Sequence, residues 1–202
     1  MILKSYKIEK NSVVASNFFL IYGENSGLKE DITDSILTLK ESKEYKKFEF
    51  DEDAVIKDIN NLYNLIYSGS LFDEKNFIII NRVTDKSLEL ADDISKKEIS
   101  DKLIFFRAGK LDKKSKIRNF FEKNKKFACI ACYQDSDIDL KKIINNELIK
   151  RKIKLSVESI NLLIERASGD RKNLRNEMAK LISYAHNKNI VTHEDIRKLT
   201  NM

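Results

Sequence analysis

The stretch FFLIYGENSGLKE, residues 18–30, decides the fold of this chain. Its first five residues are all apolar, which is typical of a strand buried on both faces. The turn at 23–27 contains two glycines, and Leu28, Ile32 and Ile36 then recur at helical spacing. We therefore expect a buried strand, a tight turn and a helix, which together are the repeating unit of an α/β fold.

The same alternation continues on the C-terminal side of this unit. Short apolar runs predict further strands at 48–50, 77–80, 103–106 and 127–133, and helical spacing of apolar residues predicts helices at 54–66, 88–94 and 117–121. Strands that lack polar alternation are typical of a parallel sheet covered by helices on both faces. Residues 1–136 are therefore predicted to form a three-layer α/β domain.

After Ser136 the strand pattern ends and only helical patterns remain. Apolar residues at helical spacing predict helix faces at 138–148, 157–167 and 174–185, and Thr192-His193-Glu194-Asp195 is typical of the capped start of a fourth helix. Residues 137–202 are therefore predicted to form a small helical lid bundle. An α/β domain with a parallel sheet followed by a helical lid resembles the AAA+ ATPase module.

The composition indicates a globular protein without a strong preference for one class of partner. Hydrophobic residues make up 42 % of the chain and charged residues 35 %, with a net charge of +6 spread along the sequence. This mild surplus permits contact with nucleic acid but favours a solvated surface of mixed charge. The N-terminus lacks the apolar region of a secretory signal, and no apolar run approaches the ~18 residues of a transmembrane helix. We expect a cytoplasmic protein with no membrane partner.

The cysteines and histidines do not suggest a catalytic or metal centre. Cys129 and Cys132 lie three apart in an apolar run, so that on a strand they point to opposite faces and are expected to be buried rather than to share a metal or a disulfide. His186 and His193 fall at positions typical of a helical surface. No hydrolase, metalloprotease or Cys/His motif is present, and we expect no catalytic residue, metal or cofactor.

The turn after the first strand lacks the residues of a phosphate-binding loop. Such a loop reads GxxxxGK[ST], because backbone amides cradle phosphate, the lysine reaches it and the hydroxyl holds magnesium. Here Gly23 is followed by Gly27 one residue early, Leu28 separates Gly27 from Lys29, and Glu30 replaces the hydroxyl residue. The strand at 77–80 is followed by Asn81-Arg82, which offers no carboxylate to magnesium. We predict that this degenerate loop binds no nucleotide.

Several stretches resemble the delta subunit of bacterial DNA polymerase III, in matching order over nearly the whole chain. They are the strand and loop at 19–25, the Ser-Leu-Phe element in Ser70–Ile80, the KLDKKSK turn at 110–116, the GDRKNLRNEMAKL helix at 169–181 and the IVTHEDI run at 190–196. The resemblance implies the first two domains of a clamp-loader subunit that hydrolyses no ATP itself. It also implies membership of the DNA-directed DNA polymerase III holoenzyme, a nucleotidyltransferase complex.

The resemblance also implies partners and a binding site. Delta subunits bind the beta sliding clamp and help to hold it open for loading onto primed DNA, while sister subunits of the gamma/tau and delta prime types bind ATP. The family joins these sisters through a third, collar domain that the resemblance does not reach, so we expect no stable assembly with them and only indirect contact with DNA. The Ser-Leu-Phe element assigns clamp binding to Ser70, Leu71 and Phe72, with Tyr67 at the rim.

Two points stay open at the level of sequence. By pattern alone, Leu71 and Phe72 fit a place under the sheet as well as an exposed loop, because most such side chains are buried. Two other functions are also considered. A working AAA+ ATPase conflicts with Glu30 and the misplaced Gly27, and a stand-alone basic DNA-binding module conflicts with the intermixed charges.

Overall fold

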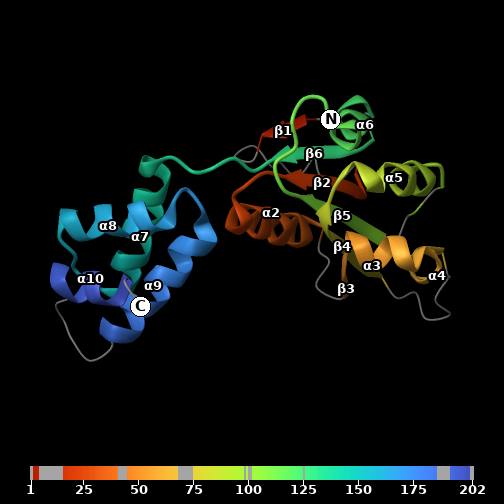
Figure 1. Cartoon of the computed structure of the whole chain (residues 1–202). Coiled ribbons are helices and arrows are strands. Elements are labelled where there is room, and N and C mark those ends of the chain that lie inside the picture. The colour runs from red at the N-terminus through yellow and green to blue at the C-terminus, as the bar shows by residue number, and fades with distance from the viewer. Residues whose placement is uncertain are drawn as a thin grey trace. The chain divides into compact units, whose positions relative to one another are not determined.

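The computed structural model describes residues 2–4, 16–40, 45–67, 75–97, 99, 102–124, 126–185 and 192–200. The chain forms two compact units (Figure 1). Unit 1 consists of Met1–Gly23 and Lys29–Cys132, and unit 2 consists of Glu24–Leu28 and Tyr133–Met202. Unit 2 therefore includes the central part of the loop that follows the first apolar stretch.

Unit 1 is built on a six-stranded sheet in which all neighbouring strands are parallel, in the order β1-β6-β2-β5-β4-β3. The strands are β1 (Ile2–Lys4), β2 (Phe18–Tyr22), β3 (Lys46–Asp51), β4 (Asn76–Val83), β5 (Lys102–Ala108) and β6 (Ala128–Ala131). β2 lies between β5 and β6, and all its residues are buried. The predicted α/β class with a parallel sheet is confirmed, and β1 is an additional strand that the sequence pattern did not indicate.

Helices lie on both sides of this sheet. They are α2 (Ser26–Leu39), α3 (Glu52–Lys57), α4 (Ile59–Tyr67), α5 (Leu88–Ser95) and α6 (Lys116–Lys123), with a short 3-10 helix η1 (Asp85–Ser87) before α5. Figure 1 shows α2 on the opposite side of the sheet from α5 and α6. This arrangement explains why the central strands are apolar throughout, since each face of a strand needs an apolar cover.

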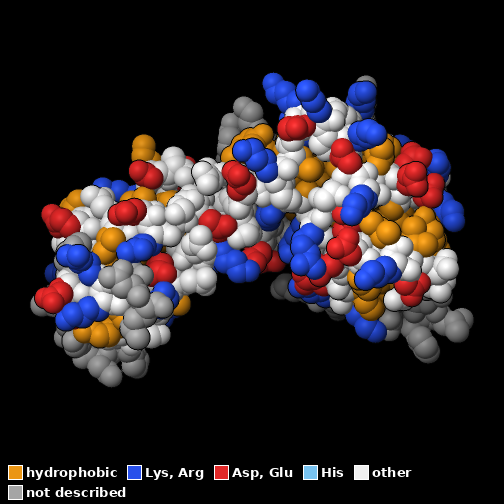
Figure 2. All heavy atoms as spheres, in the orientation of Figure 1, with side chains coloured by type: hydrophobic (Ala, Val, Ile, Leu, Met, Phe, Trp, Pro, Cys, Tyr) orange, Lys and Arg blue, Asp and Glu red, His pale blue; other side chains and the backbone are white. Residues whose placement is uncertain are grey.

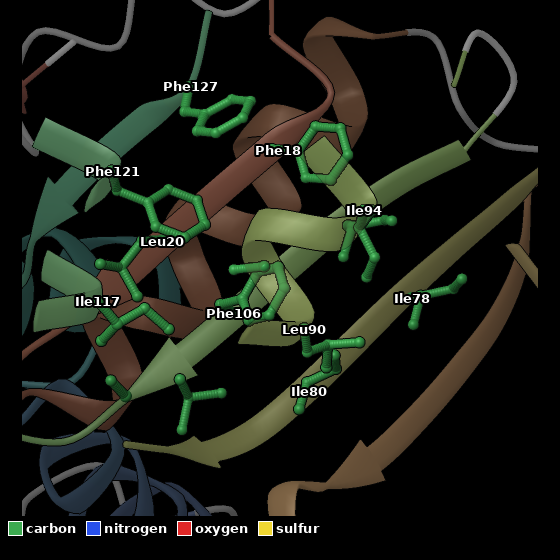
Figure 3. Packing of buried hydrophobic residues seen from close by; sticks show 14 of the residues in the cluster. Phe18, Leu20, Ile78, Ile80, Leu90, Ile94, Phe106, Ile117, Phe121 and Phe127 are labelled. Carbon is green, nitrogen blue, oxygen red and sulfur yellow. The ribbon is translucent and has the colours of Figure 1, made fainter. Parts of the chain in front are cut away.

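One core of unit 1 lies between the sheet and α3 to α6. Leu20 and Phe106 from the strands meet Ile117 and Phe121 of α6, and all four side chains are fully buried (Figure 3). The rings of Phe106 and Phe121 pack edge to face with centroids 5.5 Å apart. Buried apolar area of this kind is the main stabilising contribution to the unit.

The helix predicted over 54–66 is two helices, and the single-helix prediction was wrong. α3 ends at Lys57 and α4 begins at Ile59, because Asp58 has non-helical angles of φ −138° and ψ 75°. A side-chain oxygen of Asp58 accepts a hydrogen bond from the Asn61 amide at 3.2 Å, which caps the start of α4 as aspartate commonly does. Val55 and Leu62 are still buried, so the apolar spacing survives the break.

Unit 2 contains four helices among its described residues: α7 (Asp137–Arg151), α8 (Val157–Ala167), α9 (Arg171–Ala185) and α10 (His193–Thr200). The hydroxyls of Ser136 and Ser156 accept amide hydrogen bonds at the starts of α7 and α8. At the start of α10, the Thr192 hydroxyl accepts from the Asp195 amide at 3.2 Å, and the Asp195 carboxylate accepts from the Thr192 amide at 3.0 Å. This reciprocal pair is the predicted capped start.

Two residues assigned to helix faces of this bundle point outward. Ile138 is 68 % exposed and Val157 is 59 % exposed. On α7 the inward residues are Leu140, Ile144 and Leu148. Ile138 lies two residues before Leu140, which is about 200° around the helix axis, so it cannot share their face.

The two cysteines are buried, as predicted from their place in an apolar run. Cys129 lies on β6, whereas Cys132 follows its end. Burial raises the pKa of the Cys129 thiol to about 12. Such a thiol stays protonated at neutral pH and is a poor nucleophile.

Candidate functional site

The degenerate loop begins in unit 1 with Gly23, whose φ of +135° lies in the region that favours glycine. Its amide donates to the Gly109 carbonyl oxygen at 3.0 Å. A β-carbon at this position would lie 2.0 Å from the Cys132 carbonyl oxygen. The glycine is therefore required where the chain leaves the carboxyl end of β2 and passes beside the end of β6.

Lys29 is turned towards the backbone of unit 1. Its Nζ donates to the carbonyl oxygens of Gly23 and Ala108, each at 3.0 Å. In a working phosphate loop the lysine reaches the phosphates, whereas here its charge compensates carbonyl groups at the ends of β2 and β5. Glu30 is half-buried and adds negative charge near Arg107.

The central part of the loop, within unit 2, is held by the carboxylate of Asp170. Its Oδ2 accepts from the Ser26 amide at 2.9 Å and from the Ser26 hydroxyl at 2.7 Å. Its Oδ1 accepts from the Gly27 amide at 3.2 Å and from the Lys172 amide at 2.6 Å. One carboxylate thus binds the first amides of α2 and an amide in the first turn of α9, where helix dipoles favour negative charge.

Hydrogen bonds control the ionisation of this carboxylate. Burial by itself would raise the pKa of Asp170, but the Ser26 hydroxyl and the amides of Ser26, Lys172 and Gly27 outweigh it and hold the pKa below its usual value. Hydrogen bonds of this kind favour the charged form of an acid. Asp170 is therefore ionised at neutral pH.

Asn25 supports the same segment from beneath and is completely buried. Its amide nitrogen donates to Asp135 Oδ2 at 2.7 Å and to the Tyr133 carbonyl oxygen at 3.3 Å. Its side-chain oxygen accepts from the amides of Leu28 at 2.9 Å and Arg171 at 3.2 Å. Both polar ends of the buried amide are therefore satisfied.

Arg171 closes this polar cluster with a two-point ion pair. Its Nε and one terminal nitrogen each donate to Asp135 at 2.8 Å. The Asp135 side chain is only 6 % exposed, and paired geometry of this type is the strong form of a carboxylate–guanidinium contact. The cluster of Asn25, Asp135, Asp170 and Arg171 thus binds residues 25–28 through several hydrogen bonds.

Near the carboxyl end of β4, Asn81 and Arg82 each contact a carboxylate of β3. The Asn81 amide donates to Glu49 Oε1 at 2.8 Å, and Arg82 pairs with Asp51. Among the described residues, no group of three His, Cys, Asp or Glu side chains lies close enough to hold a metal ion. The same ranges contain no helix long and apolar enough to cross a membrane.

Of the predicted clamp-binding residues, Ser70, Leu71 and Phe72 lie outside the described residues. Tyr67 is the last residue of α4 and is half-buried. Its ring lies under Lys97 Nζ, 3.9 Å from the ring centroid, and 5.7 Å from the ring of Tyr63. Tyr67 thus fixes the end of α4 against neighbouring groups, at the point from which residues 68–74 continue.

The residues that hold the loop were missed as functional residues by sequence reasoning. A signal was available for Asp170, because Gly169-Asp170 precedes a helical pattern and aspartate is a preferred N-cap. This signal accounts for its bond to the Lys172 amide. The contacts with Ser26 and Gly27 join positions far apart in sequence, so local spacing could not predict them.

Solved structures place this architecture in the AAA+-like class. No protein-family model matches the sequence. The fold is similar to the AAA domain of FIGL-1, with a TM-score of 0.57, 12 % identity, and coverage of 95 % of this chain and 75 % of that one. A RuvB protein of Thermotoga maritima matches with a TM-score of 0.64 and 9 % identity over 98 % of this chain and 68 % of its own. These likenesses concern the fold alone.

Within this class, the chain is similar to delta subunits. The probable DNA polymerase III subunit delta of Rickettsia prowazekii (strain Madrid E) is 29 % identical over an alignment of 182 residues that covers 86 % of this chain and 52 % of that protein. The DNA clamp loader delta protein of Bacillus subtilis has a TM-score of 0.52 at 14 % identity, covering 95 % of this chain and 62 % of its own. The chain spans about half the length of the curated relative that it matches.

Proposed function

We propose that this chain is the delta-type part of a DNA polymerase III clamp loader, which binds the beta sliding clamp and helps to open it for loading onto primed DNA. The observation that carries the proposal is the 29 % identity to a probable delta subunit over 86 % of the chain. We further propose that it works in the cytoplasm beside sister subunits of the gamma/tau and delta prime types, without ATP hydrolysis of its own.

The loop geometry supports the part of this proposal that concerns ATP. The amides of Ser26 and Gly27 already bind Asp170, and Lys29 binds backbone carbonyls. A nucleotide would have to displace these partners before its phosphates could bind. In a loader of this kind, the switching by ATP therefore belongs to the sister subunits.

Clamp binding is assigned to Leu71 and Phe72, with Ser70 before them and Tyr67 at the rim. Removing two such apolar side chains from water stabilises a complex by about 3–6 kcal/mol, part of which is offset by the cost of association. The neighbouring helices contribute further apolar surface, since Ile56 is 49 % exposed and Ile59 is 36 % exposed.

The test is a binding titration of the matching sliding clamp with the double variant Leu71→Ala/Phe72→Ala, paired with a thermal melting curve. We expect affinity to fall by orders of magnitude while the melting temperature stays near that of the parent. The matched control is Ile138→Ala/Ile149→Ala, which removes two apolar side chains that are 68 % and 75 % exposed elsewhere. A double variant that melts normally and still binds the clamp would refute the site, and one that melts much earlier would place the pair in the core.

The alternative of a stand-alone DNA-binding module has less support. Figure 2 shows lysine and arginine interleaved with aspartate and glutamate on the face in view, rather than gathered into one basic stripe. Non-specific binding to nucleic acid depends on such a stripe and weakens steeply with salt. Strong, salt-sensitive binding of this chain to DNA without a clamp would favour the alternative.

A further inference from the structure

The carboxylate of Asp170 binds the central part of the degenerate loop. Asp170 accepts four hydrogen bonds, from the Ser26 amide and hydroxyl and from the amides of Gly27 and Lys172, at 2.6–3.2 Å. Three of the donors are backbone amides in the first turns of two long helices, α2 and α9. Backbone amides at a helix start are the groups with which a phosphate-binding loop holds its ligand.

Beside this carboxylate, the loop and the start of α9 approach each other closely. A β-carbon at Gly27 would lie 2.3 Å from the Lys172 nitrogen and 2.7 Å from the Arg171 carbonyl carbon. Gly27 therefore permits an approach between the loop and the start of α9 that no other residue would permit. The Asp170 carboxylate reaches the amides on both sides of this approach, because Asp170 directly precedes the start of α9.

The surrounding contacts keep the carboxylate in position. The Asn25 side-chain oxygen accepts from the Arg171 amide at 3.2 Å, and the Arg171 guanidinium pairs with the Asp135 carboxylate. The backbone of Asp170 is also held, since its amide donates to the Ala167 carbonyl oxygen at 2.9 Å. The carboxylate and the amides that bind it, those of Ser26, Gly27 and Lys172, thus all belong to this chain.

We propose that Asp170 is the resident anion of this loop. Its carboxylate accepts the amide hydrogen bonds that a phosphate would accept in a working loop, and so it occupies the first amides of α2 without any nucleotide. The inference rests on the geometry of unit 2 and not on clamp binding, so it can fail while the proposed function stands. It gives the carboxylate a role that is distinct from capping α9 alone. The closed state is set by a side chain and does not respond to ATP or ADP.

The first experiment measures amide hydrogen exchange in the full chain by NMR, for Asp170→Ala and for the matched control Asp137→Ala, which removes an acid from the first turn of α7 in the same unit. We expect exchange at Ser26 and Gly27 to accelerate at least about tenfold in Asp170→Ala, because each loses a bond to a charged acceptor. In the Asp137→Ala control, the exchange rates of the Ser26 and Gly27 amides should equal those of the parent. Unchanged exchange at Ser26 and Gly27 in Asp170→Ala would overturn the proposal.

The second experiment adds inorganic phosphate. The parent chain should show no phosphate-dependent change at the Ser26 and Gly27 amides, whereas Asp170→Ala should show one, since the cradle then lacks its anion. A response in the parent, or none in a folded Asp170→Ala variant, would contradict the proposal. If the variant does not fold, a pH titration of the parent chain by NMR decides. The resonances of the Ser26 and Gly27 amides should shift together with the Asp170 carboxyl, in one transition at a pH below the usual aspartate range. Amide resonances that do not follow the Asp170 carboxyl would refute the proposal.

Discussion

Glycine serves two different purposes at Gly23 and Gly109, although both lie at the carboxyl end of the sheet. At Gly23, the positive φ and the nearby Cys132 carbonyl oxygen leave no place for a side chain. At Gly109, nothing lies within 4 Å of the position that a β-carbon would take. The two residues also share a hydrogen bond from the Gly23 amide to the Gly109 carbonyl oxygen, so they form a matched pair for mutation.

We predict that Gly23→Ala destabilises the protein by at least about 2 kcal/mol, because the alanine is strained in φ and collides with backbone. Gly109→Ala should change the free energy of unfolding by no more than about 0.5 kcal/mol, or raise it slightly, because alanine restricts the unfolded chain. Urea denaturation followed by circular dichroism measures both. Equal effects of the two substitutions would show that the contact at Gly23 does not matter.

Lys29 shows how much of the role of a single residue could be predicted from the sequence. The misplaced Gly27 and the Glu30 after Lys29 were enough to predict a degenerate loop. They could not tell where the lysine would turn instead, because its acceptors, the carbonyls of Gly23 and Ala108, are set by the tertiary fold. For the same reason Asp170 and Asn25 could not be recognised as partners of the loop.

At the scale of elements, periodicity predicted the central strands and the helices well, because burial leaves a strong apolar pattern. Two of its errors have different physical causes. Asp58 breaks the helix expected over 54–66 by supplying its own cap. β1 is only three residues long and gains its stability from parallel pairing with β6, which a short run near the N-terminus does not reveal. The clamp-binding role of the Ser-Leu-Phe element remains a prediction, because residues 68–74 lie outside the described residues.

The start of α6 offers a test of a long-range cap. Asp85 accepts from the Ser115 hydroxyl at 2.7 Å and from the amides of Lys116 and Ile117, each at 3.0 Å. Burial opposes its ionisation, but these hydrogen bonds outweigh burial and lower the pKa of Asp85. An acid whose folded-state pKa is depressed stabilises the fold above its unfolded pKa of about 4, and this contribution is lost as pH falls through the folded value.

We therefore predict that Asp85→Ala lowers the free energy of unfolding by about 1–2 kcal/mol near neutral pH, as loss of a helix cap does. The difference from the parent should shrink as pH falls from about 5 to about 2, where the parent carboxylate becomes protonated. Denaturant titrations across this range measure it, with Glu89→Gln as the control, since Glu89 is an exposed acid in the first turn of α5. A difference that stays constant with pH would exclude a role for the charge.

At the scale of the whole molecule, an AAA+-like fold occurs together with a loop whose donors are occupied by protein groups. The fold class follows from the strand order and the structural likenesses. The closed loop follows from Asp170, Asn25 and Lys29. Fold and nucleotide chemistry are therefore separate properties of this chain, in keeping with the rule that function depends on sites rather than on folds.

The corresponding prediction is that Mg-ATP does not raise the melting temperature of the chain. A ligand present at 100 times its dissociation constant stabilises the native state by about 2.7 kcal/mol, so useful affinity would be visible in a thermal shift. A nucleotide-binding AAA+ ATPase measured in parallel provides the positive control. A clear upward shift with Mg-ATP would restore the ATPase alternative.

Unit 2 is discontinuous in the chain, and this affects the order in which it can be completed during synthesis. Residues 24–28 leave the ribosome early, but Asp135, Asp170 and Arg171 follow only after all of Lys29–Cys132 has been translated. Until then the Asn25 amide nitrogen and the amides of Ser26 and Gly27 lack the Asp135 and Asp170 carboxylates that accept from them in the folded unit. A nascent chain stalled after Cys132 should expose Ser26 and Gly27 to rapid hydrogen exchange, and translation through the start of α9 should protect them. The first turn of α2 is therefore completed only after the start of α9 has been translated.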